Sequence, residues 1–543
     1  GVNGAGAAFD AATRGLSVGL VESHDWASGT SSRSSKLMHG GLRYLQMLDF
    51  KLVAEALRER DLLLEHTAPH LVKPIKFVFP FFKKVIDRGF IGSGVMLYDA
   101  MQSVGRKRAV PFHRHLLHDK MLEVFPALDG DKAVGALEYY DAQVDDARFV
   151  MMLVRSAAQL DASVANYTTV VDYLHEGERV VGARVRDEES GEEFDVRARH
   201  VILAGGVWTQ EQQELAGADG GLEVLASKGI HVTVARDRIP AVPDTGIITQ
   251  TEKSVLFIIP WDEYWVIGTT DTPWTQDPRD VGATSDDIDY VLEHANAVLA
   301  DDLTREDVIG VYSGLRPLLQ PVKKGSDKGS TKVSREHTVM QVEPGLSAIA
   351  GGKYTTYRVM AEDVVDFAIK DTEPGRPSLT RSVPVIGAQG YQALVRDKAA
   401  IGRRIGADEI RVDRLLFRYG SLLTDVLALI DEDPSLATPL EHAPRYLRAE
   451  VVYAARAEGA RHLADVLERR TRLDYETRDR GVAAADEVAA LLAPELGWDE
   501  TTVRAEVDAY RGYIEARLAG EATASDAEAA SRIAAAAEVP ARR

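Results

Sequence analysis

The 543-residue sequence contains no cysteine. That absence excludes disulfide bridges, thiolate-bound metals, iron–sulfur clusters, cysteine nucleophiles and a flavin tethered through sulfur. Long hydrophobic runs are also missing, since no apolar stretch approaches the roughly 20 residues that span a bilayer. No secretory signal sequence is recognisable. The sequence therefore predicts a cytoplasmic protein that is free to touch a membrane surface.

Positive charge is in short supply. The chain has 64 lysine and arginine residues against 84 acidic ones, which gives a net charge of −20. A surface this acidic argues against nucleic acid as a general partner. Hydrophobic residues at 45% and charged residues at 27% are ordinary for a globular protein. The length is too great for one core and predicts two or three domains.

The first 22 residues, GVNGAGAAFDAATRGLSVGLVE, have the pattern of the second half of a dinucleotide-binding βαβ unit. Gly1 and Gly4 match the second and third glycines of G-x-G-x-x-G, and Leu16 to Val21 predicts a buried strand. Glu22, 18 positions after Gly4, matches the acid that binds a ribose. The competing interpretation is an Ala- and Gly-rich helix followed by an unrelated strand. The first glycine and strand of the motif are not in the sequence, so we expect a chain that begins inside it.

The stretch Thr30 to Leu45, TSSRSSKLMHGGLRYL, concentrates hydroxyl, small and cationic side chains. It offers backbone N–H groups, O–H donors and cationic heads to a phosphate-bearing ligand, but little to a hydrophobic core. We expect its residues up to His39 to face a cofactor. Arg43 and Tyr44 are expected to face a second, smaller phosphate, with the chain turning between the two at Gly40–Gly41.

From Lys73 to Arg114 the charge balance reverses, and phenylalanines are interleaved with lysines and arginines. One interpretation is a patch that meets anionic lipid, with aromatic rings entering the headgroup region. The other, which the alternation in FVFPFF favours, is a strand at a sheet edge that buries its phenylalanines.

Four later segments deliver glycines and polar residues to strand ends. They are LAGGVW with Ala204 and Gly205, IGTTD with Thr270, GLRPL with Arg316, and GGKYTTYR with Gly352, Lys353, Thr355 and Thr356. Antiparallel strands lie between them, so their order predicts a discontinuous dinucleotide-binding domain with a substrate domain threaded through it. The segment GSDKGST at 325–331 lacks the P-loop order and predicts a surface turn.

From about residue 380 the pattern changes to amphipathic helices without strand signals. The last segment, 521–543, is rich in alanine and mixed charge and predicts a disordered tail.

Together these motifs resemble the FAD-dependent glycerol-3-phosphate dehydrogenases, the aerobic, respiratory, quinone-linked family. The resemblance runs over nearly all 543 residues and includes YYDAQVDDAR, SREH and LADVLERRTRL. It implies FAD as cofactor, oxidation of sn-glycerol 3-phosphate to dihydroxyacetone phosphate by hydride transfer from C2 to flavin N5, and electron transfer to a membrane quinone. It also implies a homodimer that lies peripherally on the inner face of the cytoplasmic membrane. The basic, aromatic segment from Lys73 to Arg114 adds an anionic lipid surface as a further candidate partner.

The implied fold class is α/β. A discontinuous Rossmann-like FAD-binding domain carries an inserted antiparallel-sheet substrate domain and is followed by a C-terminal all-α domain. We assign 1–72, 139–226 and 337–372 to the FAD-binding domain, and 73–138 and 227–336 to the substrate domain. The helical domain is assigned to 380–520 and the tail to 521–543.

For FAD, the resemblance places Glu22 at the adenosine ribose, and it places the helix that begins at Gly1 and Gly4 at the pyrophosphate. The other cofactor-binding residues line the pyrophosphate and the flavin ring: Thr30, Ser31, Ser32, Lys36, His39, Ala204, Gly205 and Gly352. Thr355 and Thr356 would open a helix whose positive end stabilises the anion at N1 of reduced flavin. No metal site is expected.

The substrate phosphate requires planar, bidentate donors, so Arg43 and Arg316 are the expected clamp, with Tyr44 adding an O–H donor. Thr270 is expected to position a substrate oxygen. Lys353 is assigned to the oxyanion that develops on the product, or to the phosphate.

His231 is the candidate base, because a neutral imidazole can accept the hydroxyl proton near pH 7. The alternative for a lone histidine in a strand is a structural role. His231, Arg316 and Lys353 thus form the expected catalytic set.

Three other functions compete. A glycerol-3-phosphate oxidase of the same fold would carry an insertion after GGKYTTYR, whereas here a helix is predicted at once. An amino-acid oxidase would need one arginine for its substrate carboxylate and would leave the second arginine and the lysine unexplained. A third alternative is an inactive, N-terminally truncated flavoprotein that binds no flavin.

Overall fold

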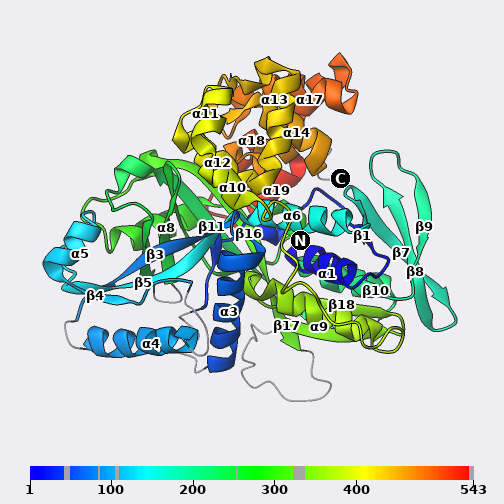
Figure 1. The fold of residues 1–543 in the computed structure, drawn as a ribbon, viewed down its shortest axis with the longest axis horizontal. Coiled ribbons are helices and arrows are strands. Elements are labelled where there is room, and N and C mark those ends of the chain that lie inside the picture. The colour runs from blue at the N-terminus through cyan, green and yellow to red at the C-terminus, as the bar shows by residue number, and fades with distance from the viewer. Residues whose placement is uncertain are drawn as a thin grey trace.

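The computed structural model describes residues 1–41, 49–83, 86–103, 109–218, 221–251, 255–321 and 337–536. They form an N-terminal α/β domain, a domain built on a large mixed sheet, and a C-terminal helical domain (Figure 1). Across these ranges, no helix combines the length and the apolar character that crossing a membrane requires.

The α/β domain is organised around helix α1 (Val2–Thr13), which packs against α6 (Asp146–Gln159) and α9 (Tyr357–Ile369). Strand β1 (Gly19–Val21) pairs in parallel with β6 (Ser163–Ala165). Strand β10 (Val201–Leu203) pairs in parallel with β18 (Leu346–Gly351), which continues into antiparallel β17 (His337–Glu343). The helix and strand predicted for the first 22 residues are therefore present, although the strand begins at Gly19.

The glycine at position 4 allows α1 to pack closely against β1 and against the residue that follows β10. A Cβ on Gly4 would lie 3.5 Å from the Ala204 Cβ, just after β10, and 3.9 Å from the Leu20 Cδ1 in β1. A larger side chain would push the helix outward, because buried packing leaves no spare space.

A separate three-stranded antiparallel sheet extends from this domain. It consists of β7 (Thr168–Glu176), β8 (Arg179–Asp187) and β9 (Glu193–Arg197) in that order. Strands β8 and β9 form an antiparallel hairpin, in which residues 182–186 pair with residues 193–197.

Among the described residues, the second domain is built on a ten-stranded mixed sheet. Its main path runs β15 (Thr272–Pro273), β11 (Leu222–Ala235), β14 (Tyr264–Gly268), β13 (Val255–Trp261), β12 (Thr245–Gln250), β3 (Val72–Phe81), β5 (Gly135–Val144) and β2 (Leu37–Met38). Strand β16 (Val308–Pro321) pairs with β11, and β4 (Arg114–Leu117) pairs with β5. Helices α3 (Phe50–Leu62), α4 (Ile86–Ser103), α5 (His118–Val124), α7 (Thr209–Leu215) and α8 (Ser285–Asn296) complete these two domains.

Strand β3 corrects one prediction. It does bury its phenylalanines, since Phe77, Phe79 and Phe81 belong to one apolar cluster, so the strand interpretation of FVFPFF is confirmed. However, β3 is hydrogen-bonded to β5 on one side and to β12 on the other, and it is not a sheet edge. These three rings are therefore closed to lipid. Two predicted domain boundaries, 138/139 and 226/227, also fall inside single strands, β5 and β11.

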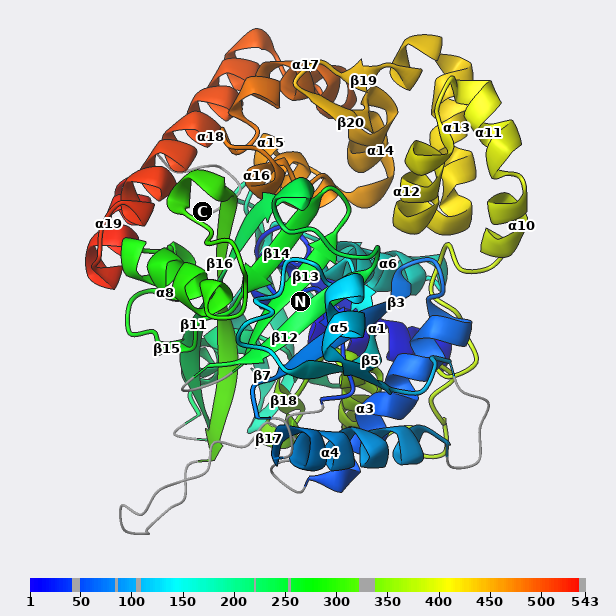
Figure 2. The same ribbon diagram turned by 90° about the vertical axis from the view of Figure 1, so that its left-hand side faces the viewer.

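The C-terminal domain arches over the mixed sheet, from α10 at one end to α19 beside α8 at the other (Figure 2). Its helices are α10 (Tyr391–Arg396), α11 (Lys398–Ile405), α12 (Glu409–Tyr419), α13 (Leu423–Glu432), α14 (Arg448–Glu458), α15 (Leu463–Asp465), α16 (Leu473–Glu476), α17 (Ala485–Leu496), α18 (Glu500–Glu521) and α19 (Asp526–Ala535). A short hairpin, β19 (Pro439–Leu440) and β20 (Ala443–Leu447), interrupts the helices, contrary to the prediction of helices alone.

Helix α19 corrects the predicted tail. Ala529 and Ile533 on one face of α19 are buried, and Ser525 caps the helix by accepting from the Glu528 N–H. An alanine-rich sequence is compatible with disorder, but here the apolar face of the helix packs against the rest of the protein and stabilises it. Residues 521–536 are therefore ordered, and 537–543 lie outside the described residues.

Candidate active site

The N-terminus of α1 and the end of β1 meet at one edge of the α/β domain. Glu22 directly follows β1, and its Oε2 lies 3.3 Å from the Gly1 nitrogen. The Ser31 Oγ accepts a hydrogen bond of 3.0 Å from the Val2 N–H, so this hydroxyl lies at the positive end of the helix. Gly1, Glu22 and Ser31, all predicted to bind the cofactor, are brought together.

The loop from Thr30 to Lys36 links this helix end to the mixed sheet. Thr30 Oγ1 donates to the Leu315 carbonyl at 2.7 Å, and Ser32 Oγ lies 3.5 Å from the Gly29 carbonyl. Ser31 and Ser32 are buried. The first two residues of the loop thus fix it to strand β16, through Thr30, and to α1, through Ser31.

Lys36 differs from its predicted position along the cofactor. Its buried ammonium donates to Asp146 Oδ1 and to the Ser32 carbonyl, both at 2.7 Å. Burial lowers the pKa of Lys36, and the Asp146 carboxylate opposes that shift. The Asp146 Oδ2 also accepts from the Ser34 N–H and hydroxyl. Lys36 therefore holds the Thr30–Lys36 loop to the start of α6 from the protein interior.

Asp146 is a residue that the sequence analysis did not select, although it lies in the quoted motif YYDAQVDDAR. It begins α6, is fully buried, and binds Lys36 and Ser34. Its carbonyl accepts a 2.6 Å hydrogen bond from the Tyr354 hydroxyl. An acidic pair at the start of an apolar helix was the available signal.

The GGKYTTYR segment reaches the same place from β18. Thr355 Oγ1 donates to the His39 carbonyl at 3.0 Å, and Thr355 and Thr356 lie directly before α9. The Nζ of Lys353 is buried. His39, which follows β2, is therefore grouped with Gly352, Thr355 and Thr356, which lie between β18 and α9.

Arg316 lies within β16 and not at a strand end as predicted, and its side chain is held by the loop that follows β14. Its Nη1 donates to the Thr270 carbonyl at 3.0 Å, and its Nη2 donates to Thr269 Oγ1 at 2.9 Å. The side chain stays 30% exposed. A Cβ on Gly229 would lie 2.4 Å from the Arg316 Nη2, so only glycine leaves room for the guanidinium here. Arg316 and Thr270 are brought together as predicted.

His231 lies two residues after Gly229 on β11, so both residues face the same side of the sheet. Its ring stacks on Tyr312 at 4.8 Å between centroids, and its Nε2 is 2.9 Å from Ser35 Oγ. Burial and then the charges of Arg316 and Lys36 hold the pKa of His231 well below 6.5. The ring is therefore neutral near pH 7, and it lies between the loop Thr30–Lys36 and Arg316.

Two predicted substrate ligands, Arg43 and Tyr44, lie outside the described residues. Ala204 and Gly205 follow β10 beside α1, as the contact of Ala204 with position 4 shows. No group of three or more metal-ligating side chains gathers anywhere in the described ranges.

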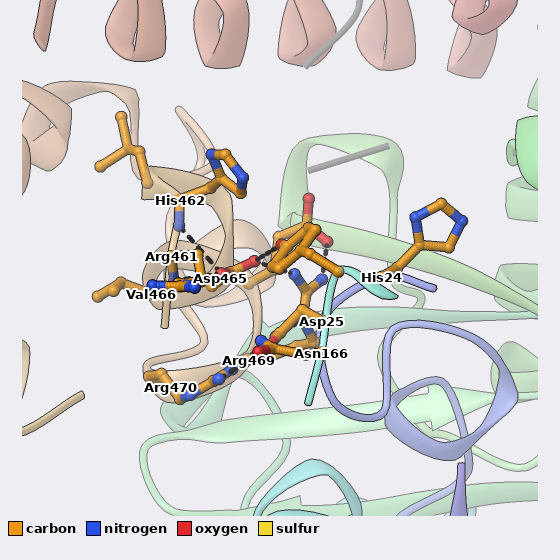
Figure 3. Close-up of polar contacts among 12 residues, drawn as sticks. His24, Asp25, Asn166, Arg461, His462, Asp465, Val466, Arg469 and Arg470 are labelled. Carbon is orange, nitrogen blue, oxygen red and sulfur yellow. Dashed lines mark hydrogen bonds and ion pairs between the residues drawn. The ribbon is translucent and has the colours of Figure 1, made fainter. Parts of the chain in front are cut away.

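The loop after Glu22 is tied to the C-terminal domain. Asp25 is fully buried between two arginines, with its Oδ2 2.5 Å from the Arg469 Nε and its Oδ1 2.7 Å from the Arg470 Nη2 (Figure 3). Burial alone would raise the pKa of Asp25, but Arg470 and Arg469 outweigh burial and lower it. No local sequence pattern predicts this network, although Arg469 and Arg470 lie in the motif LADVLERRTRL.

A family model described as FAD dependent oxidoreductase matches residues 1–358, and one described as the C-terminal domain of alpha-glycerophosphate oxidase matches residues 378–503. Glycerol-3-phosphate dehydrogenase 2 of Mycobacterium tuberculosis (strain ATCC 25618 / H37Rv) is 50% identical to the chain over 531 residues, which is 97% of the chain and 89% of the relative. The chain belongs to the FAD-dependent glycerol-3-phosphate dehydrogenase family. The mitochondrial glycerol-3-phosphate dehydrogenase of Arabidopsis thaliana is 35% identical, over 95% of the chain and 85% of the relative.

Solved structures agree with this assignment to the glycerol-3-phosphate dehydrogenase family. The glycerol-3-phosphate dehydrogenase from Bacillus halodurans, complexed with FAD, matches with a TM-score of 0.77 and 28% identity, covering 95% of this chain and 93% of that one. The L-alpha-glycerophosphate oxidase of Mycoplasma pneumoniae matches with a TM-score of 0.52 at 18% identity, covering 68% of this chain and 92% of that one, which shows a shared fold.

FAD is the cofactor of this family, and the donor set described above fits it. The N-terminus of α1 offers N–H groups to the pyrophosphate, and Glu22 lies beside that end with a carboxylate for a ribose. The start of α9 places a second positive helix end near His39 and Lys353.

Proposed function

We propose that the chain oxidises sn-glycerol 3-phosphate to dihydroxyacetone phosphate and passes the electrons to a membrane quinone. The observation that carries this proposal is the 50% identity over 97% of the chain to a protein named glycerol-3-phosphate dehydrogenase 2. The grouping of Arg316, Thr270 and His231 beside the Thr30–Lys36 loop supports it. FAD, when bound, accepts at N5 the hydride that leaves C2.

In this proposal Arg316 binds the substrate phosphate. The contacts to Thr269, Thr270 and, at 3.6 Å, Asp271 orient the guanidinium plane in advance, and the 30% exposed side chain is accessible to a dianion. Arg43 and Tyr44 are the proposed second half of the clamp. Thr270 holds the loop against β11, since its hydroxyl accepts from the Ile230 N–H at 3.1 Å.

His231 receives the C2 hydroxyl proton in this proposal. Its depressed pKa keeps the ring in the proton-accepting form, and the ring's contact with Ser35 offers the proton a path onward. Lys353, with its buried ammonium, stabilises the negative charge that develops on the C2 oxygen.

The quinone as acceptor and a peripheral position on the inner face of the cytoplasmic membrane are further parts of the proposal. Exposed large apolar side chains on and around α4 and β4 support a membrane contact: Phe82, Met96, Leu97, Phe112 and Leu117. Apolar residues of this kind enter the headgroup region of a bilayer. A homodimer remains a prediction from the family.

The second candidate is a glycerol-3-phosphate oxidase, which the name of the matching C-terminal family model favours. The structure supports the dehydrogenase instead, because the short helical turn Tyr354–Thr356 passes directly into α9 and leaves no room for the insertion expected of an oxidase.

One experiment tests these functions. Substrate is added to the purified, FAD-loaded protein without oxygen, and the flavin absorbance near 450 nm, about where oxidised flavins absorb, is followed. We expect bleaching by sn-glycerol 3-phosphate, fast recovery with a soluble quinone analogue, and slow recovery with oxygen. Fast recovery with oxygen would favour the oxidase, and a protein that takes up no FAD would favour the inactive-flavoprotein alternative.

A further inference from the structure

A buried lysine outside the predicted site connects the C-terminal helix to the substrate loop. Lys228 on β11 is 1% exposed, and its ammonium forms ion pairs with Asp287 of α8 and Asp526 of α19. A buried ammonium is stable only when it is well paired. The second carboxylate comes from the last described helix, 298 positions away in the chain.

The backbone of the same lysine holds the loop that follows β14. The Lys228 carbonyl accepts from Thr270 Oγ1 at 3.4 Å and from Thr272 Oγ1 at 3.5 Å. The Thr270 carbonyl in turn accepts from the Arg316 Nη1. Contacts therefore run without a gap from Asp526 through Lys228 and Thr270 to Arg316.

Helix α19 is also packed against this loop by apolar contacts. Ala530 lies in one buried cluster with Trp274, which follows the loop, and with Leu315, which precedes Arg316. A Cβ on Gly282 would lie 2.7 Å from the Ile533 Cδ1, so α19 rests closely on the segment before α8. The Ser285 N–H donates to the Thr523 carbonyl at 2.7 Å.

The carboxylate of Asp287 cannot replace Asp526 without cost. It already accepts from the Thr284 N–H and hydroxyl and so completes the capping box of α8. Loss of Asp526 would leave the buried ammonium with the one carboxylate that also caps α8, so the ammonium would be held less firmly.

We propose that α19 is a strap that positions the substrate loop, residues 269–272, and through it the phosphate-binding Arg316. Lys228 and Asp526 are positioning residues: neither touches the substrate, and both act through Thr270. This inference rests on the proposed function for the identity of the ligand, but the strap itself can be tested without a substrate.

The test compares Asp526→Asn with Glu528→Gln in the full-length, FAD-loaded protein. Glu528 lies on the same helix and pairs with Arg532, also on α19, so it is a matched control. We expect Asp526→Asn to raise KM for sn-glycerol 3-phosphate roughly threefold to tenfold, with kcat and the FAD-to-protein ratio unchanged. Glu528→Gln should match the wild type, and Asp526→Glu should restore most of the loss.

A second measurement is independent of the reaction. Hydrogen exchange of the backbone amides from 269 to 274 should accelerate in Asp526→Asn and stay at the wild-type rate in Glu528→Gln. The Lys228→Met variant combined with Asp526→Asn should change KM no more than the larger of the two single changes, because both remove the same link. If Lys228→Met does not fold, the comparison of Asp526→Asn with Glu528→Gln still tests the strap.

Three results would overturn the strap: unchanged exchange from 269 to 274, faster exchange with an unchanged KM, or loss of FAD in Asp526→Asn but not in the control. Failure of the wild type to bleach with sn-glycerol 3-phosphate would instead refute the proposed function. In that case the exchange measurement alone confirms or refutes the link from α19 to the loop.

Discussion

Arg316 owes its orientation to two oxygens of the neighbouring loop, one carbonyl and one hydroxyl. Because those contacts fix the guanidinium plane before a ligand arrives, less entropy is lost on binding. Gly229 belongs to the same arrangement, because a Cβ at this position would lie 2.4 Å from the Arg316 Nη2.

Arg316→Lys should therefore weaken substrate binding more than it slows chemistry. We expect KM to rise about tenfold to a hundredfold, the range for one or two lost charged hydrogen bonds, while the bound flavin spectrum stays unchanged. Steady-state kinetics measure KM. The ratio of flavin absorbance at about 450 nm to protein absorbance at about 280 nm measures the bound flavin. Arg305→Lys is the control, since Arg305 pairs with Asp289 on the surface. Unchanged KM would remove Arg316 from the phosphate clamp.

His231 leads to a prediction about pH. Because its folded-state pKa lies well below 6.5, the neutral, proton-accepting form persists as pH falls from 8 to about 6, and its contribution to activity should be lost only below that depressed pKa. The pH profile of kcat/KM should therefore show no acid limb near 6.5. An acid limb at that pH in the wild type, absent from His231→Asn, would contradict this assignment.

At the scale of elements, the contact of α1 with α9 fixes the two helix ends that face the cofactor. A Cβ on Gly6 would lie 3.0 Å from the Tyr357 Cδ2 and 3.4 Å from the Ala361 Cβ, so the side chains of α9 pack closely on the backbone of α1 at this glycine. The Phe149 ring of α6 meets the Tyr357 ring of α9 edge-on, with 5.1 Å between the ring centroids, so α6 packs against the same part of α9.

Gly6→Ala tests this packing. Alanine normally stabilises a helix interior relative to glycine by roughly 0.5–1 kcal/mol, but at this position overpacking should cost about 1–3 kcal/mol instead. Gly512→Ala in α18 is the matched control, because a Cβ there meets nothing within 4 Å and should raise stability. Thermal unfolding of the FAD-loaded proteins should thus move in opposite directions for the two variants.

At the scale of the whole molecule, buried ion pairs join the C-terminal domain to the α/β domain. Arg33 in the Thr30–Lys36 loop pairs with Glu468 and Asp474, while Asp25 pairs with Arg469 and Arg470. His462 adds a third link, with Nδ1 2.9 Å from Glu506 of α18 and Nε2 2.8 Å from Glu189 in the turn between β8 and β9.

His462 makes stability depend on pH. Burial opposes its charge, but hydrogen bonds to Glu189 and Glu506 raise its pKa from 6.5 to about 10. Because the folded-state pKa is the higher one, this stabilisation is complete below about pH 6.5 and disappears as pH rises through 10. The midpoint of urea unfolding should fall between pH 7 and pH 10, and His462→Gln should remove much of that slope. An equal slope in both proteins would contradict the link.

Several features could be predicted from the sequence because they are written in local patterns. The small-residue face of α1, the strand before Glu22 and the β8–β9 hairpin follow from periodicity and turn chemistry alone. The contacts of Thr355 with His39 and of Arg316 with Thr270 join residues that the family resemblance had assigned to one ligand each, the cofactor and the substrate.

The sequence by itself thus determined which segments become helices and strands, which ends carry polar residues, and which family the chain resembles. Only the tertiary structure decided which charges are joined: Lys36 to Asp146, Asp25 to Arg470, and Lys228 to Asp526. Periodicity specifies the face on which a side chain lies, but not which distant segment will cover it. A buried charge requires a partner within hydrogen-bonding reach, and that partner is supplied only when the chain has folded back on itself.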